Sequence, residues 1–341
     1  MNEHLPIARK VSLIYGFLSA LNAGAWLIAF AAFRSHPITL GTALLAYAFG
    51  LRHAVDADHI AAIDNVTRKL MQEGKRPASV GFFFSLGHST IVVLLAVAIT
   101  VGANAVRAHI SVLQSTGATI GTIISALFLL TIAAMNVAVL AEVLRAFNRE
   151  RREGFAGEAA LEQTMSRRGV MGRVFRPLLA MVDASWKMYP IGILFGLGFD
   201  TATEVGLLGI AAIEAGKGLP IVDIMIFPLL FTAGMALLDT TDGILMLGAY
   251  GWAFVKPVRK LCYNVTVTLV SIFVALFVGS VESLGLIGSQ LKVNGGFWPL
   301  LDAIENHIDT LGGAIIATFL ISWIVSAILY RLNRGVEPER P

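Results

Sequence analysis

The chain has 341 residues, of which 56% are hydrophobic and 14% are charged, and its formal net charge is +3. Soluble globular proteins carry about 25% charged residues, so this composition excludes an ordinary soluble enzyme and indicates a membrane protein. The single cysteine, Cys262, excludes an internal disulfide and a cluster of thiolate metal ligands.

Eight long apolar runs predict an all-α, polytopic membrane protein with eight transmembrane helices. The expected spans are residues 11–33, 38–63, 78–102, 118–144, 188–213, 222–248, 263–286 and 311–331. We expect them to form a single transporter domain over residues 1–341. A hydrophilic loop at residues 145–187 separates the first four spans from the last four.

Basic residues are distributed unevenly between alternate loops. With the N-terminus in the cytoplasm, 21 of the 26 Lys and Arg residues lie inside and four lie outside. Cytoplasmic loops of membrane proteins are enriched in Lys and Arg, so the asymmetry predicts that both termini are cytoplasmic. The basic excess therefore reflects topology in a lipid bilayer, and we expect no nucleic-acid partner.

The second predicted span contains many charged and titratable residues within FGLRHAVDADHIAAID, residues 49–64. An Asp or Arg at the centre of a membrane helix costs about 2.5–3.5 kcal/mol on insertion. These groups therefore need a buried partner, an ion or water. The alternative to an ion site is a salt-bridge network of Arg52 with the Asp residues that only locks helices together.

On a helical wheel the imidazoles of His53 and His59 share one stripe with Asp56, whereas Asp58 points elsewhere. We expect Asp58 to hold a ligand in place or to contact a neighbouring helix. His53 and His59 are separated by about 9 Å along a straight helix, so one ion can bind both only if the helix bends. Gly50 can permit that bend; otherwise the stretch offers two successive sites.

The third predicted span contains another histidine, His88, at mid-depth between Gly87 and Ser89. Taken alone, this side chain can equally well hydrogen-bond to a neighbouring helix. A short loop joins its span to the one that carries the other two histidines. His88 is therefore the expected third imidazole ligand.

Spans five and six contain four carboxylates, with Asp200 and Glu204 on one helical face and Asp239 and Asp242 on another. Neither span contains Lys or Arg, so these groups suit cations better than salt bridges. Protonated carboxyls that pack helices together are the alternative. The residues expected along the ion pathway or behind the ligands are Arg52, Ser89, Asp200, Thr201, Glu204, Asp239, Thr240 and Asp242.

Four motifs occur in order in spans two, three, five and six: RHAVDADHI, LGHST, LGFDTATE and GMALLDTTDG. Together they resemble the nickel/cobalt transporter (NiCoT) family of secondary permeases over essentially the whole chain. The resemblance implies eight helices, both termini inside, uptake of Ni²⁺ or Co²⁺, and essential roles for His53, Asp58 and His59. The expected metal site is therefore His53, Asp56, Asp58, His59 and His88.

Imidazole with carboxylate suits Ni, Co, Zn or Fe. The predicted function is a secondary transporter, not an enzyme, that imports Ni²⁺ and/or Co²⁺ across the cytoplasmic membrane, with no cofactor beside this substrate. The chain contains no GxxxxGK[ST] loop, so we expect no ATPase of its own. The alternatives are a carrier of Mn²⁺, Zn²⁺ or Fe²⁺ and, less favoured, an intramembrane metal-dependent hydrolase.

An inverted repeat is a further hypothesis. FGLRHAVDAD at 49–58 aligns with FGLGFDTATE at 195–204, and LGHST at 86–90 aligns with LLDTT at 237–241. This alignment pairs Asp58 with Glu204 and His88 with Asp239, in spans that cross the membrane in opposite directions. Such repeats place the ion site at their interface. Chance similarity between apolar helices is the alternative.

Overall fold

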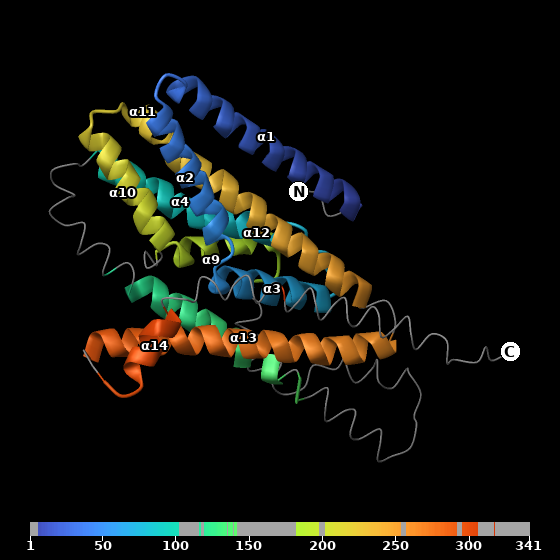
Figure 1. Cartoon of the computed structure of the whole chain (residues 1–341). Helices are drawn as coiled ribbons and strands as arrows, with labels where there is room; N and C mark the ends of the chain where they lie inside the picture. The colour runs from blue at the N-terminus through green and yellow to red at the C-terminus, as the bar shows by residue number, and fades with distance from the viewer. Residues whose placement is uncertain are drawn as a thin grey trace, which may run out of the picture.

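The computed structural model describes residues 6–101, 116, 119–134, 136–138, 140–141, 182–197, 202–253, 257–291, 295–305 and 317. Every regular element within these residues is helical (Figure 1), as the sequence predicted. Five helices are long and apolar enough to cross a membrane, or six if one bent pair counts as a single span. The chain is therefore a polytopic membrane protein. The eighth expected span lies outside the described residues except for residue 317, and most of the 145–187 loop lies outside them too.

Long apolar helices account for five of the predicted spans. They are α1 (Ile7–Phe33), α4 (Val80–Val101), a helix over Thr119–Ala138, α12 (Ile226–Ala253) and α13 (Pro257–Leu291). The short helix α11 (Ile221–Ile224) leads into α12, and α14 (Trp298–Glu305) follows α13. Pro257 starts α13, which extends beyond both predicted ends of the seventh span.

The second predicted span is a pair of helices rather than one. α2 (Pro37–His53) and α3 (Ala57–Gln72) meet at residues 54–56, and their directions differ by 50°. α3 also continues through most of residues 64–77, the segment between the second and third predicted spans, so this connection is largely helical. The physical reason is that Ile63, Val66 and Leu70 continue the apolar spacing of the helix and are buried.

The fifth predicted span also consists of two helices in the described residues. A single 3-10 turn, η1 (Ser185–Lys187), leads into α9 (Met188–Phe195), and a turn at residues 196–197 follows. α10 (Ala202–Gly216) continues the chain. The two interrupted spans, α2 with α3 and α9 with α10, carry most of the titratable residues that the sequence singled out.

Helices α4 and α9 touch backbone to backbone through a pair of glycines. A Cβ atom added to Gly87 of α4 would lie 2.0 Å from the carbonyl oxygen of Tyr189 in α9. A Cβ atom added to Gly192 of α9 would lie 2.0 Å from the carbonyl oxygen of Phe84 in α4. No side chain larger than hydrogen fits at either position, so the glycines set the distance between the two helices.

Helices α2 and α12 meet in the same manner. A Cβ atom on Gly50 of α2 would lie 2.1 Å from the carbonyl oxygen of Phe231 in α12. A Cβ atom on Gly234 of α12 would lie 2.9 Å from the carbonyl oxygen of Tyr47 in α2. Gly50, which we expected to permit a bend in the second span, therefore lies in a close helix contact, and the bend itself follows His53.

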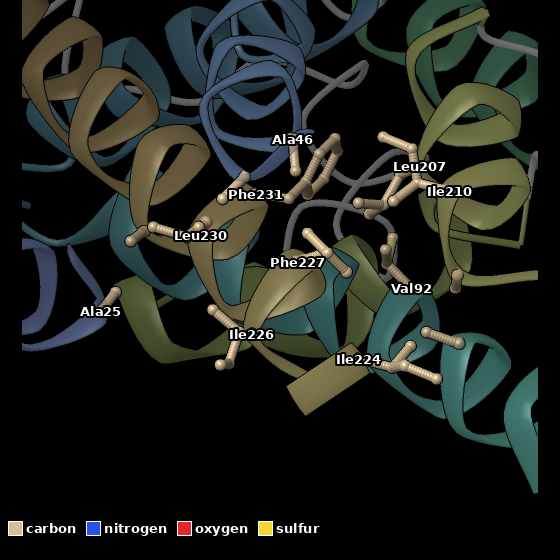
Figure 2. Packing of buried hydrophobic residues seen from close by; sticks show 14 of the residues in the cluster. Ala25, Ala46, Val92, Leu207, Ile210, Ile224, Ile226, Phe227, Leu230 and Phe231 are labelled. Carbon is tan, nitrogen blue, oxygen red and sulfur yellow. The ribbon is translucent and has the colours of Figure 1, made fainter. Parts of the chain in front are cut away.

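An apolar core holds α12 against α2, α4 and α10. Figure 2 shows Phe227 and Phe231 of α12 in a cluster with Ala46 of α2, Val92 of α4 and Leu207 of α10. All five side chains are at most 1% exposed. The core therefore brings together the helices on which the predicted site residues lie.

Candidate metal site

Three buried histidines converge at the junction of α2, α3 and α4. His53 is the last residue of α2, His59 lies in the first turn of α3, and His88 lies within α4. Each offers a ring nitrogen, and the three nitrogens lie within 4.8 Å of one another. The ring centroids of His53 and His59 are 4.6 Å apart, which the break between the helices permits. The bend that a shared ion requires is therefore present.

A carboxylate from α10 reaches the same point. The Nε2 atoms of His53 and His88 are 2.9 Å apart. Glu204 Oε1 lies 2.7 Å from His88 Nε2 and 3.7 Å from His53 Nε2. Glu204 is completely buried, so three polar atoms from three helices gather at one point away from lipid and water.

Two further carboxylates lie behind the histidine rings. His53 Nδ1 is 2.7 Å from Asp56 Oδ2, and His59 Nδ1 is 3.3 Å from Asp239 Oδ1. A proton on Nδ1 that is donated to a carboxylate leaves Nε2 as the lone-pair nitrogen of each ring. The Nε2 atom of His59 is buried and has no hydrogen-bond partner among the described residues.

Asp58 supports the start of α3. It is half-buried, and its Oδ1 accepts a hydrogen bond of 2.8 Å from the backbone N–H of His59. A carboxylate in the first turn of a helix satisfies a free N–H group and interacts favourably with the helix dipole. Asp58 thus holds the backbone N–H of His59, which differs from the contact with an imidazole nitrogen or a neighbouring helix that the helical wheel suggested.

Several other predicted residues lie near this cluster as buried polar groups. Both carboxylate oxygens of Asp242 and the hydroxyls of Ser89 and Thr240 are buried without a hydrogen-bond partner among the described residues. Asp239 and Asp64 lie close enough to Asp242 to act on it electrostatically. Buried oxygens of this kind suit a path for a cation.

The remaining predicted pathway residues are Arg52, Asp200 and Thr201. Asp200 and Thr201 lie outside the described residues. Arg52 is exposed, although the next residue, His53, is buried.

Sequence reasoning missed a buried polar network in α3. Ser271 Oγ of α13 donates a hydrogen bond of 2.7 Å to Asp64 Oδ2. Asn65 Oδ1 accepts hydrogen bonds from Arg68 Nη2 at 3.0 Å and from Asn136 Nδ2 at 2.6 Å. Most of this segment follows residue 63, where the second predicted span ends. The apolar spacing that continues past residue 64 was the signal for a buried helix.

Comparisons with known proteins agree with the motifs. The family model described as "High-affinity nickel-transport protein" (NicO) matches residues 39–329. The chain is 55% identical to the high-affinity nickel transport protein of Cupriavidus necator, over 97% of this chain and 94% of that protein.

Two other relatives carry names with different metals. The chain is 45% identical to the nickel transporter NicT of Mycobacterium tuberculosis, over 100% of this chain and 94% of that protein. It is 39% identical to the cobalt transport protein NhlF of Rhodococcus rhodochrous, over 88% of this chain and 84% of that protein. No solved structure matches the chain. On these grounds and on its four motifs, the chain belongs to the NicO family of high-affinity nickel-transport proteins.

Proposed function

We propose that the protein imports Ni²⁺ and/or Co²⁺ across the cytoplasmic membrane through a site centred on His53, His59 and His88. The observation that carries this proposal is the convergence of three buried imidazoles inside a polytopic membrane protein. The names of the relatives support a transporter rather than an enzyme, and they support nickel or cobalt as substrate.

The donor set fits the proposed substrate. Imidazole nitrogen and carboxylate oxygen are suitable ligands for Ni²⁺ and Co²⁺, which bind nitrogen donors more tightly than Mn²⁺ does. Asp56, Glu204 and Asp239 lie within hydrogen-bonding distance of the histidine rings. Their negative charge compensates the charge of a dehydrated divalent ion, which otherwise makes burial in the membrane costly. Asp56 and Asp239 then orient ligands, and Asp58 fixes the start of α3.

The membrane potential is a sufficient source of energy in this proposal. An elementary charge that crosses 100 mV gains about 2.3 kcal/mol, so a divalent ion gains about 4.6 kcal/mol. At about 1.4 kcal/mol for each factor of ten, this supports a concentration gradient of roughly 2,000-fold. Uptake at trace concentration therefore needs no ATPase within this chain.

We further propose that the chain crosses the cytoplasmic membrane eight times and that both termini lie in the cytoplasm. The distribution of Lys and Arg supports this orientation. In Figure 1 the start of α1, the end of α3 and the start of α13 lie toward the same side of the molecule. This placement agrees with the expected alternation of the connecting loops.

The two close helix contacts support an inverted repeat in a register other than the predicted alignment. Tyr47 and Gly50 in α2 match Tyr189 and Gly192 in α9, because each pair lies three residues apart in a backbone contact. In the same way, Phe84 and Gly87 in α4 match Phe231 and Gly234 in α12. The contact of α4 with α9 thus has a counterpart in the contact of α12 with α2.

This register is shifted by four residues, about one helical turn, from the alignment that we predicted. It pairs Asp58 with Asp200 instead of Glu204. It also pairs His53 with Phe195, and these residues end α2 and α9 respectively. Under this proposal, the break in the second span and the interruption in the fifth are equivalent features of two inverted halves.

The test is uptake of labelled Ni²⁺ and Co²⁺ by cells that express the chain, with Mn²⁺, Zn²⁺ and Fe²⁺ as competitors. We expect accumulation of Ni²⁺ or Co²⁺ that exceeds that of cells with an empty vector. Selective accumulation of Mn²⁺, Zn²⁺ or Fe²⁺ supports the alternative carrier. An intramembrane hydrolase would concentrate no ion, and that result would contradict transport.

A further inference from the structure

We infer that Glu204 is a direct ligand of the transported ion, which adds a carboxylate from α10 to the three histidines. The inference rests on the proposed metal site. Glu204 is completely buried, and its Oε1 lies 2.7 Å from His88 Nε2. The sequence suggested only that this residue lies along the pathway or behind the ligands.

The distances between three donor atoms, His53 Nε2, His88 Nε2 and Glu204 Oε1, fit one shared ion. Their separations are 2.9 Å between His53 Nε2 and His88 Nε2, 2.7 Å from His88 Nε2 to Glu204 Oε1, and 3.7 Å from His53 Nε2 to Glu204 Oε1. The circle through these atoms has a radius of about 1.9 Å, just below the bond of about 2.1 Å that imidazole and carboxylate make to Zn²⁺. One ion slightly off the plane of the three atoms therefore contacts them all.

The chemistry of the contacts also favours an ion at this point. Two imidazole nitrogens at hydrogen-bonding distance repel each other through their lone pairs unless a proton or a cation lies between them. Asp56 accepts a hydrogen bond from Nδ1 of His53, so Nε2 of this ring carries the lone pair and faces His88 and Glu204. A divalent ion accepts electron pairs from all three atoms, and the negative charge of the Glu204 carboxylate offsets part of the charge of the ion.

The alternative is that Glu204 only positions His88, by accepting a hydrogen bond from its Nε2 atom. The ion would then bind a different nitrogen of His88 and would not touch the carboxylate. The two arrangements predict different ligand sets around the ion, so the absorption spectrum of bound Co²⁺ separates them. Metal uptake alone does not.

The experiment is a titration of the purified full-length protein in detergent with Co²⁺, followed by its visible absorption bands. The variants are Glu204→Gln, which removes the charge and keeps the size, and Glu204→Asp, which shortens the side chain. The control is Glu214→Gln, because Glu214 is a buried carboxylate on the same helix and pairs with Lys217 at 2.8 Å. Thermal unfolding of each variant shows whether it is folded.

We expect Glu204→Gln to weaken Co²⁺ binding at least about tenfold and to change the energies of the Co²⁺ bands. Glu214→Gln should leave affinity and spectrum as in the wild type. Weaker binding with an unchanged spectrum would show that Glu204 acts through His88 and would overturn the inference. If Glu204→Gln does not fold, unchanged affinity and spectrum in Glu204→Asp would overturn it. Failure of the wild type to bind Co²⁺ or Ni²⁺ would instead contradict the proposed function.

Discussion

The Nε2 atoms of His53 and His88 lie 2.9 Å apart, although one residue ends α2 and the other lies within α4. α2 stops at His53, and the chain turns before α3 begins. His59 joins the pair from the far side of that break, with its ring centroid 4.8 Å from that of His88. A helix break, not a continuous stripe, therefore assembles the imidazoles.

The first prediction concerns the three histidines. His53→Ala, His59→Ala and His88→Ala should each lower nickel uptake at low concentration at least about tenfold, because each removes about 1.4 kcal/mol or more of ion binding. Protein abundance in the membrane should stay near normal. His36→Ala is the matched control, since His36 is exposed at the start of α2. Wild-type uptake by any of the three variants, at equal abundance, would exclude that histidine as a ligand.

The second prediction concerns the carboxylates behind the rings. Asp56→Asn and Asp239→Asn should each weaken the apparent affinity for nickel by about 10- to 100-fold, because the partners of a ligating histidine orient its ring. The measurement is the nickel concentration at half-maximal uptake. Asp223→Asn in α11 is the control, and it should retain wild-type affinity. Wild-type affinity in Asp56→Asn and Asp239→Asn, as in the control, would mean that the carboxylates do not position the rings.

The third prediction concerns the contact between α4 and α9. Gly87→Ala and Gly192→Ala each place a methyl group 2.0 Å from a carbonyl oxygen of the other helix, so the helices must separate. We expect a lower thermal unfolding temperature in detergent and weaker nickel uptake, because α4 also carries His88. Gly24→Ala in α1 meets nothing within 4 Å. This control should be neutral or more stable by about 0.5–1 kcal/mol, and equal loss of stability in all three would contradict the contact.

The three histidines that the structure brings together were already singled out by residue type and spacing. His53, His59 and His88 were expected as ligands because imidazoles are costly in a membrane helix without a partner. The bend between His53 and His59 followed from the rise of a helix and from the assumption of one shared ion. The sequence did not locate that bend, because a helical wheel assumes a straight axis and contains no information about packing against α12.

Other features depend on contacts between distant segments. Glu204 lies 116 residues after His88, and only the packing of α10 on α4 brings the two side chains together. Asp64 stood at the predicted end of the second span, and Arg68 looked like a loop residue because hydropathy assigns charged groups to water. Their burial at 0% and 1% exposure depends on partners from other helices and from the same helix, which local sequence does not reveal.

The fourth prediction concerns orientation. In a background with Cys262 replaced, Lys75→Cys should be protected from an impermeant thiol reagent in intact cells, and Lys217→Cys should react. Both lysine side chains are exposed, at 46% and 57%, so accessibility differs only through the side of the membrane. Permeabilised cells provide the control, in which both positions should react. The reverse labelling pattern would overturn the orientation derived from the basic residues.

The position of the bound ion tests the account most directly. Anomalous diffraction at the nickel absorption edge, from crystals of the nickel-loaded protein, locates the ion independently of any transport assay. We predict one strong peak among His53, His59 and His88, with ligand bonds of about 2.0–2.2 Å to imidazole nitrogen and to Glu204. A nickel peak elsewhere in the protein, with this cluster empty, would contradict the account.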